Sequence, residues 1–174
     1  MIELITGGSG SGKSEYAERR ICLAHEKNME RPLVYIATMQ PYGAEGHERV
    51  KRHRKMRRGK GFDTVECYKD IAGLNITEGS DAILECIGNL VANEMFSSET
   101  ADAGCVSRIK RGIDTLARNC KNLCIVTNEV FSDGIKYDAG TDMYMRAIAE
   151  VNMYIASIAD RVTEVVFSVP ITIK

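Results

Sequence analysis

The feature that most constrains the fold of this chain is a glycine and serine run close to its start. The eight residues 7–14, GGSGSGKS, match the pattern G-x-x-x-x-G-K-[ST] in full. An apolar segment, Ile2–Thr6, precedes the run, and a segment with helical periodicity, about residues 13–26, follows it. Glycines tolerate positive φ, so successive backbone N–H groups can point at phosphate oxygens, and the following helix adds its positive end. The sequence therefore predicts a strand, a phosphate-binding loop and a helix.

The last two residues of this motif have separate expected roles. Lys13 should reach the β- and γ-phosphates of a nucleoside triphosphate, and Ser14 should ligate Mg²⁺. Such sites need a second acid at the end of a neighbouring strand to hold or orient the ion. Glu85, after residues 81–84 (DAIL), is the preferred candidate, and Glu129, after residues 124–128 (CIVTN), is the alternative. A flexible Gly/Ser linker, the competing interpretation, would match the full motif by chance in about one chain in a hundred or fewer.

Apolar and helical segments alternate along the rest of the chain. Strands are expected at 32–38, 62–68, 81–86, 123–129 and 162–174, and helices at 45–58, 87–96, 106–116 and 141–160, with a loop over 130–140. This order is typical of an α/β fold with a mainly parallel sheet and helices on both faces, in which ligands bind at the carboxyl ends of the strands. With 174 residues and no internal repeat, the chain is predicted to form a single domain, 1–174.

Composition and the first residues restrict where the protein acts. No apolar run approaches the ~20 residues that a membrane-spanning helix needs. The start of the chain has no basic leader before an apolar stretch, so we expect a cytoplasmic protein with no membrane span. The six cysteines are scattered, which favours reduced thiols over disulfides. Cys120 and Cys124 are four residues apart but lack the second ligand pair of a zinc site.

Charge is distributed unevenly along the chain. Residues 49–60, RVKRHRKMRRGK, contain eight Lys or Arg and no acidic residue, whereas the rest of the chain carries 15 basic and 24 acidic residues. A basic segment on an acidic body points to a local anionic ligand. Because the segment contains no aromatic residue to stack on bases, nucleic acid is not the expected partner. A triphosphate clamp and a merely solvated helix are the remaining interpretations.

A single histidine, His53, lies inside this basic segment. On a helix, Arg49 and Arg57 would flank it one turn away on either side. Nearby positive charge disfavours the imidazolium, so His53 is expected to be neutral at physiological pH. A neutral imidazole among cations is a suitable nucleophile for a nucleotide α-phosphorus, because the cations stabilise charge on the transferring group. The alternative is a surface histidine with no chemical role.

Together these segments resemble the bifunctional adenosylcobinamide kinase / adenosylcobinamide-phosphate guanylyltransferase family of cobalamin biosynthesis. The similar segments are ITGGSGSGKSEYAE, YIATMQ, RVKRH followed by TVECY, LECIGNLVANEMF, VTNEV with Gly134-Ile135, and Arg146 with Asn152. The resemblance implies a RecA-like P-loop NTPase fold, commonly assembled as a homotrimer. It also implies two reactions. ATP or GTP phosphorylates adenosylcobinamide on its aminopropanol hydroxyl, and GMP then passes from GTP to adenosylcobinamide phosphate through a guanylylated histidine, giving adenosyl-GDP-cobinamide.

The resemblance also assigns roles to residues by position. Lys13 and His53 are assigned catalytic roles, and Ser14 and Glu85 are assigned to binding the metal ion, Mg²⁺. The residues assigned to nucleotide binding are Gly7, Gly8, Ser9, Gly10, Ser11, Gly12, Lys13, Ser14, Thr38, Met39, Gln40, Arg54, Glu66 and Glu85.

Two alternatives to this two-step enzyme stay open. One is a P-loop small-molecule kinase without the guanylyl step, since Arg52 stands beside His53 where some family members have paired histidines. The other is a nucleotide-binding regulatory module whose basic helix docks a partner. The sequence does not choose between ATP and GTP as phosphate donor.

Overall fold

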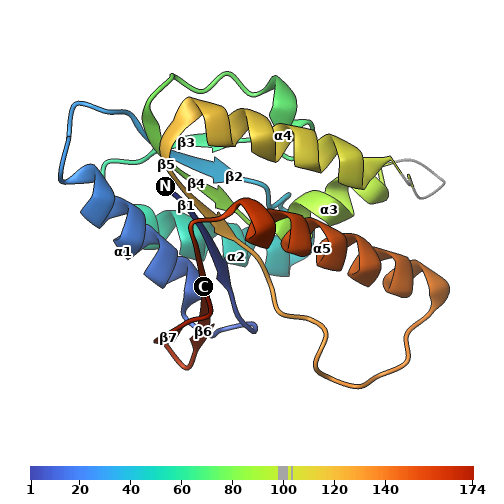
Figure 1. Cartoon of the computed structure of the whole chain (residues 1–174). Helices are drawn as coiled ribbons and strands as arrows, with labels where there is room; N and C mark the ends of the chain where they lie inside the picture. The colour runs from blue at the N-terminus through green and yellow to red at the C-terminus, as the bar shows by residue number, and fades with distance from the viewer. Residues whose placement is uncertain (98–101, 103) are drawn as a thin grey trace.

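The computed structural model describes residues 1–97, 102 and 104–174, and its strands form one sheet (Figure 1). The sheet contains β1 (Ile2–Thr6), β2 (Leu33–Ala37), β3 (Asp63–Glu66), β4 (Ser80–Glu85), β5 (Cys120–Val126), β6 (Arg161–Val166) and β7 (Val169–Thr172). Their order across the sheet is β3-β2-β4-β5-β1-β6-β7. Neighbouring strands are parallel except β6 and β7, which are antiparallel. The predicted mainly parallel sheet is confirmed.

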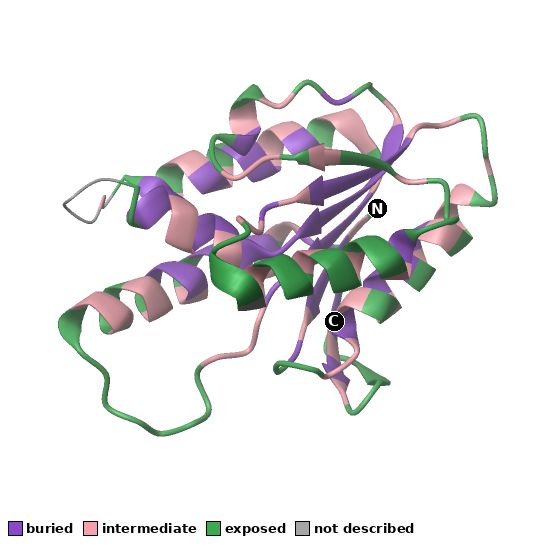
Figure 2. Cartoon of the chain, turned by 180° about the vertical axis from the view of Figure 1, so that it is seen from behind, coloured by how far each residue is buried: buried purple, intermediate pink, exposed green. Residues whose placement is uncertain are grey.

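The helices cover both faces of this sheet, as predicted. They are α1 (Lys13–His25), α2 (Gly43–Arg57), the short 3₁₀ helix η1 (Ile71–Gly73), α3 (Ile87–Met95), α4 (Cys105–Asn119) and α5 (Ala139–Ile158). The helices α3, α4 and α5 lie on one face, and α1 and α2 lie on the other (Figures 1 and 2). None of the described helices is long and apolar enough to cross a membrane.

Helix α5 begins two residues earlier than the predicted 141, and its N-terminal cap explains why. The Asp138 side chain accepts hydrogen bonds from the backbone N–H groups of Gly140 and Thr141, at 2.9 Å and 3.0 Å. An aspartate cap of this kind satisfies N–H groups that have no partner within the helix. The loop predicted over 130–140 is therefore shorter than expected, and the helix ends at Ile158 rather than at 160.

Two apolar cores lie on opposite sides of the sheet. The larger one packs Leu4 and Leu84 of the strands against α3, α4 and α5, with Ile113 and Val151 fully buried. The smaller one packs α1 against the other face. Each large side chain buried this completely contributes roughly 1.5–3 kcal/mol by leaving water. Each of the six cysteines, all of which lie in the described part of the chain, is a free thiol.

Helix α4 passes very close to η1 at Gly112. A Cβ atom at Gly112 would lie 2.3 Å from Cγ1 of Ile71 and 3.0 Å from the backbone nitrogen of Ala72. Real side chains do not approach this closely, so only glycine fits here without movement of the neighbouring segment. This contact joins the segment after β3 to the helical layer.

The carboxyl ends of the parallel strands meet at one edge of the sheet. Strand β1 runs into the glycine loop there, and β4 ends at Glu85. Of the two acids proposed for the metal, Glu129 follows β5, the direct neighbour of β1, whereas Glu85 ends β4, one strand further away. The second acid was expected on a neighbouring strand, so strand order alone would favour Glu129. The side-chain contacts, by contrast, favour Glu85, whose carboxylate accepts a hydrogen bond from Ser14 of the loop.

Candidate functional site

An open cleft of about 800 Å³ lies at this edge, between the glycine loop and α2. Its walls come from the loop and the start of α1, from α2, and from the residues that follow β2, β4 and β5. The lining residues are Ser9, Gly10, Ser11, Gly12, Lys13, Ser14, Glu15, Met39, Glu48, Arg49, Arg52, His53, Met56, Glu85, Cys86, Asn89 and Asn128. The phosphate-loop motif and the basic helix, which the sequence separates by about 30 residues, therefore share one cleft.

The glycine loop has the conformation that its sequence predicts. Gly10 and Gly12 adopt φ angles of 72° and 90°, a region that favours glycine. A Cβ atom at Gly12 would also lie 2.7 Å from Oγ of Ser168. The Lys13 Nζ donates a hydrogen bond to the Gly8 carbonyl at 3.0 Å. Burial lowers the pKa of Lys13, while the Cys86 and Glu85 side chains oppose that shift. An anion beside Lys13 would therefore meet a poorly hydrated cation.

Ser14 and Glu85 meet inside this cleft. The Ser14 hydroxyl donates a hydrogen bond to Oε1 of Glu85 at 2.7 Å. The Glu85 side chain is almost completely buried, and burial raises its pKa to about 7 even though the Ser14 hydrogen bond and the Lys13 charge lower it. Hydroxyl and carboxylate oxygens are the donors that Mg²⁺ prefers, so the pair fits that ion.

Glu129 is directed to a different set of partners. Its carboxylate accepts hydrogen bonds from the Phe131 backbone N–H and the Ser132 hydroxyl, both at 2.9 Å. It is not among the residues that line the cleft. Of the two acids that the sequence proposed, the structure brings Glu85 to the phosphate loop.

Thr38 lies behind the wall of the cleft and holds the end of β4. Its side chain is fully buried, and its hydroxyl accepts a hydrogen bond from the Cys86 N–H at 2.7 Å and lies 2.7 Å from the Glu85 carbonyl oxygen. Of the three residues assigned to the nucleotide at 38–40, only Met39 lines the cleft. Gln40 instead accepts a hydrogen bond from the Tyr42 hydroxyl. The contacts of Thr38 indicate support for Glu85 and no direct access to a ligand.

His53 faces the cleft from α2, among cations. Burial is the largest cause that lowers the pKa of His53, followed by the charges of Arg52, Arg57, Lys13 and Arg49. The sequence-based expectation of a neutral imidazole therefore has a second cause, desolvation, which the sequence did not reveal.

The arginines of α2 divide between two sides of the helix. Arg49 and Arg52 line the cleft beside His53. Arg57, which the helical spacing also placed next to His53, donates a hydrogen bond from Nε to the Thr64 hydroxyl at 3.0 Å, and its guanidinium lies 4.4 Å from the centre of the Tyr35 ring. Through these two contacts, Arg57 packs the C-terminal end of α2 against β2 and β3 of the sheet.

Arg54 and Glu66, both assigned to nucleotide binding, bond to each other. The Tyr68 hydroxyl donates a second hydrogen bond to Glu66 at 2.7 Å. The hydrogen bonds from Tyr68 and Arg54 lower the pKa of Glu66. Neither Arg54 nor Glu66 is among the residues that line the cleft, so the structure keeps this pair apart from the phosphate loop.

The sequence analysis assigned no role to several polar residues of the cleft, which are Glu15, Glu48, Arg52, Asn89 and Asn128. Asn128 directly follows the buried end of β5, and Asn89 lies in the first turn of α3. A polar residue just after a buried strand is the signal that identified Glu85, and it could also have identified Asn128. Arg52 was noted only as the neighbour of His53, because the helical face that it occupies was not separated from that of Arg57.

Comparison with known proteins shows similarity over the whole chain. The model of a family described as cobinamide kinase / cobinamide phosphate guanyltransferase matches residues 3–173. A protein of Salmonella typhimurium strain LT2, named bifunctional adenosylcobalamin biosynthesis protein CobU, is 32% identical over 189 aligned positions that cover all of both chains. A protein of the same name from Escherichia coli K12 is 30% identical, again over the full length of both chains.

Proposed function

The chain belongs to the cobinamide kinase / cobinamide phosphate guanyltransferase family, and we propose that this single cleft, between the glycine loop and α2, serves both reactions through the phosphate loop and His53. In the first, adenosylcobinamide is phosphorylated by a nucleoside triphosphate. In the second, GMP passes from GTP to adenosylcobinamide phosphate. The main support for the proposal is that residues 9–14 of the loop and His53 line the same cleft, although Gly7 and Gly8 are not among its lining residues.

The phosphate loop and Glu85 perform the kinase step. The backbone N–H groups around Gly10 and Gly12 bind the β- and γ-phosphates, and Lys13 neutralises their charge. Ser14 and Glu85 would hold Mg²⁺, which would supply further neutralisation of the phosphate charge. The alcohol oxygen of adenosylcobinamide forms a bond to the γ-phosphorus as the bond to the β-phosphate oxygen breaks. The alcohol proton leaves to solvent, and the nucleoside diphosphate is released.

His53 performs the guanylyl step. Its neutral imidazole attacks the α-phosphorus of GTP, so that a nitrogen–phosphorus bond forms and pyrophosphate leaves. Arg49 and Arg52, on the cleft side of α2, stabilise the charge of the transferring group. A phosphate oxygen of adenosylcobinamide phosphate then displaces the imidazole. Adenosyl-GDP-cobinamide is released, and His53 returns to its neutral state.

One turnover assay separates this proposal from its alternatives. The protein is incubated with adenosylcobinamide, GTP and Mg²⁺, and adenosylcobinamide phosphate, adenosyl-GDP-cobinamide and pyrophosphate are measured. We expect all three. Adenosylcobinamide phosphate alone would reduce the protein to a kinase, and nucleotide binding without any product would support a regulatory module. Replacing GTP by ATP in the same assay identifies the phosphate donor.

Three variants assign the steps to residues. Lys13→Ala should abolish phosphorylation of adenosylcobinamide because it removes the cation beside the transferred group. His53→Ala should retain phosphorylation and lose adenosyl-GDP-cobinamide. The matched control is His47→Ala, because His47 is exposed on the same helix and bonds only to the Gly43 carbonyl among the described residues. Loss of both products in His47→Ala would contradict the assignment.

We also propose that residues 1–174 form one domain and assemble as a homotrimer in the cytoplasm. Strands β1 and β6, from opposite ends of the chain, pair in the same sheet, which supports a single domain. A single cooperative unfolding transition is expected. The trimer rests on the family resemblance, and light scattering of the purified protein tests it. A monomeric or dimeric mass at assay concentration would contradict it.

A further inference from the structure

A second, much smaller cavity lies between α2 and the sheet, directly behind the cleft. Its volume is about 30 Å³, and His53 lines both this cavity and the cleft. Tyr35 of β2 and Glu85 of β4 form the opposite wall. A volume of this size holds one water molecule, provided that two to four polar groups surround it.

Three polar side-chain atoms around this cavity are buried and form no hydrogen bond of standard geometry among the described residues, although the Tyr35 hydroxyl and the Glu85 carboxylate lie near enough to shift each other's pKa. They are Nδ1 of His53, the hydroxyl of Tyr35 and Oε2 of Glu85. An unsatisfied buried polar group costs about 1–3 kcal/mol, so three of them around one cavity point to a shared partner. The other oxygen of Glu85 is already bonded to Ser14.

The donor and acceptor properties of the three groups allow two ways for one water molecule to connect them. When Glu85 is ionised its carboxylate only accepts, so the water donates a proton to Oε2 of Glu85 and accepts one from the Tyr35 hydroxyl. The water can then either accept from a protonated Nδ1 of His53 or donate its second proton to an unprotonated Nδ1. In the first arrangement Nε2 keeps its lone pair, and in the second Nε2 carries the imidazole proton.

We propose that a buried water linking Glu85 and Tyr35 to Nδ1 of His53 fixes the histidine in the tautomer whose Nε2 can attack the α-phosphorus. This inference rests on the proposed function, because only the arrangement with Nδ1–H leaves Nε2 the lone pair that the attack requires. Tyr35 is a positioning residue. The Arg57 guanidinium lies over its ring, and the Phe62 ring packs against it edge to face at 5.7 Å between centroids.

The arrangement also connects the two halves of the active site. One carboxylate, Glu85, contacts the phosphate loop through Oε1 and Ser14, and reaches the nucleophile through Oε2 and the water. Because β4 carries Glu85 between the two, the loop and His53 are held in a fixed relation even though α2 is mostly exposed (Figure 2).

Nitrogen-15 NMR of the full chain, labelled at histidine and free of nucleotide, tests the tautomer directly. The His53 signals are assigned from His53→Ala, and spectra are recorded at mildly alkaline pH, where the imidazole is neutral. We expect the Nδ1–H tautomer to predominate in the wild type. Tyr35→Phe, which removes one hydroxyl, and Glu85→Gln, which removes the carboxylate, should both shift His53 toward Nε2–H.

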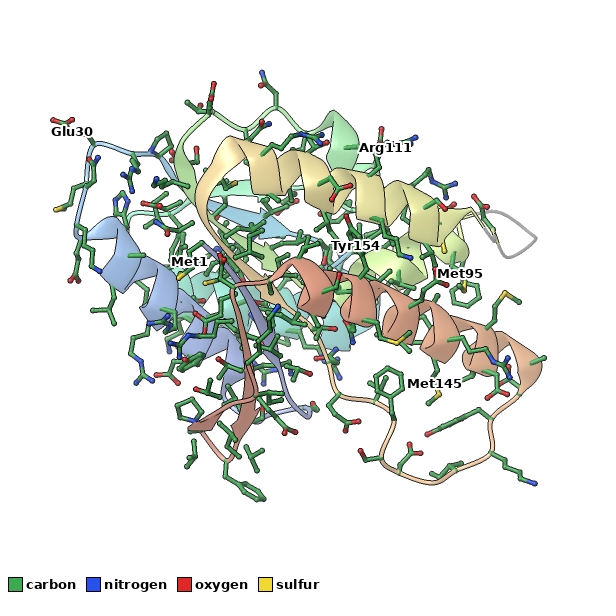
Figure 3. All side chains as sticks on the ribbon, viewed as in Figure 1. Met1, Glu30, Met95, Arg111, Met145 and Tyr154 are labelled. Atoms are coloured by element: carbon green, nitrogen blue, oxygen red, sulfur yellow. The ribbon has the colours of Figure 1, made fainter. Side chains whose placement is uncertain are left out.

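The matched control is Tyr154→Phe. Tyr154 lies on α5, on the other face of the sheet, and its hydroxyl bonds to Asp114 (Figure 3). The Tyr154→Phe variant should leave the His53 NMR signals unchanged. A wild-type His53 that is mainly Nε2–H, or one that does not respond to Tyr35→Phe or Glu85→Gln, would overturn the inference. Circular dichroism of each variant identifies loss of folding.

The rate of covalent labelling by GTP supplies a second readout. Tyr35→Phe should lower the maximal rate of labelling roughly tenfold, the size expected for loss of an orienting partner, with little change in the GTP concentration that gives half the maximal rate. An unchanged maximal rate would contradict the inference. If no protein is labelled although His53 is the Nδ1–H tautomer, the proposed guanylyl step fails and the inferred network stands. If His53 is labelled but is mainly the Nε2–H tautomer, the inferred network fails and the proposed guanylyl step stands.

Discussion

Replacing Thr38 by valine should destabilise the protein by about 2 kcal/mol, because one buried hydroxyl holds the end of β4. Valine keeps the shape of the side chain and replaces the hydroxyl by a methyl group. Thr38 is fully buried, and its hydroxyl accepts a hydrogen bond from the Cys86 N–H at 2.7 Å. The substitution therefore tests a hydrogen bond and not a change of volume.

The size of the expected loss of stability depends on which groups lose their only hydrogen-bonding partner when the Thr38 hydroxyl is removed. The Glu85 carbonyl also accepts from the Thr38 N–H at 2.8 Å, and the Cys86 carbonyl also accepts from the Leu90 N–H at 3.1 Å, so both stay bonded. The Cys86 N–H, by contrast, has no other partner among the described residues. One unsatisfied buried N–H costs about 1–3 kcal/mol. For a protein of this length, a loss of about 2 kcal/mol lowers the midpoint of thermal unfolding by roughly 4–8 °C.

Urea unfolding followed by circular dichroism measures this loss as a change in the free energy of unfolding. Thr172→Val is the matched control, since Thr172 is exposed on the edge strand β7 and should change stability by less than about 0.5 kcal/mol. Thr38→Ser, which keeps a hydroxyl, should lose less than Thr38→Val. If Thr38→Val costs no more than Thr172→Val, the hydroxyl does not support Glu85 as described.

Two further predictions concern packing and pH. Gly112→Ala should destabilise the protein by about 1–3 kcal/mol, because the added Cβ would lie 2.3 Å from Ile71 Cγ1; an unchanged urea midpoint would show that α4 does not pack this closely on η1. The imidazole of His53, followed by nitrogen-15 NMR, should take up a proton only below pH 6.5, the ordinary pKa of histidine, because burial and four neighbouring cations lower the pKa of His53. A midpoint at or above 6.5 would contradict this. By linkage, unfolding takes up a proton at His53 only between its lowered pKa and 6.5, so His53 makes stability decrease as the pH falls through that window.

The phosphate loop could be predicted from the sequence because its conformation depends on neighbouring residues. Gly10, Gly12 and Lys13 lie within four positions of one another, and the strand before them and the helix after them have clear periodicity. Glu85 was also found from the sequence, since the carboxyl ends of parallel strands meet at one edge. The prediction did not specify that β5 separates β4 from β1, because strand order depends on long-range packing.

The residues whose roles depend on packing between distant segments could not be predicted in this way. Thr38 bonds to a residue 48 positions further along the chain, and no local pattern distinguishes that contact from a contact with a nucleotide. Arg54 and Glu66 fit a nucleotide site by position in the family, yet they bond to each other across the gap between α2 and β3. The burial of His53 is likewise a property of the folded chain.

The most direct test of the account is to locate the covalent product of the reaction with GTP. The full chain is incubated with Mg²⁺ and GTP labelled at the α-phosphorus, digested, and the labelled peptide is identified by mass spectrometry. The account predicts one acid-labile, base-stable GMP adduct on His53, absent from His53→Ala and present in His47→Ala. A label on a different residue, or formation of adenosyl-GDP-cobinamide by His53→Ala at the wild-type rate, would contradict the claim that His53 and the phosphate loop form one active site.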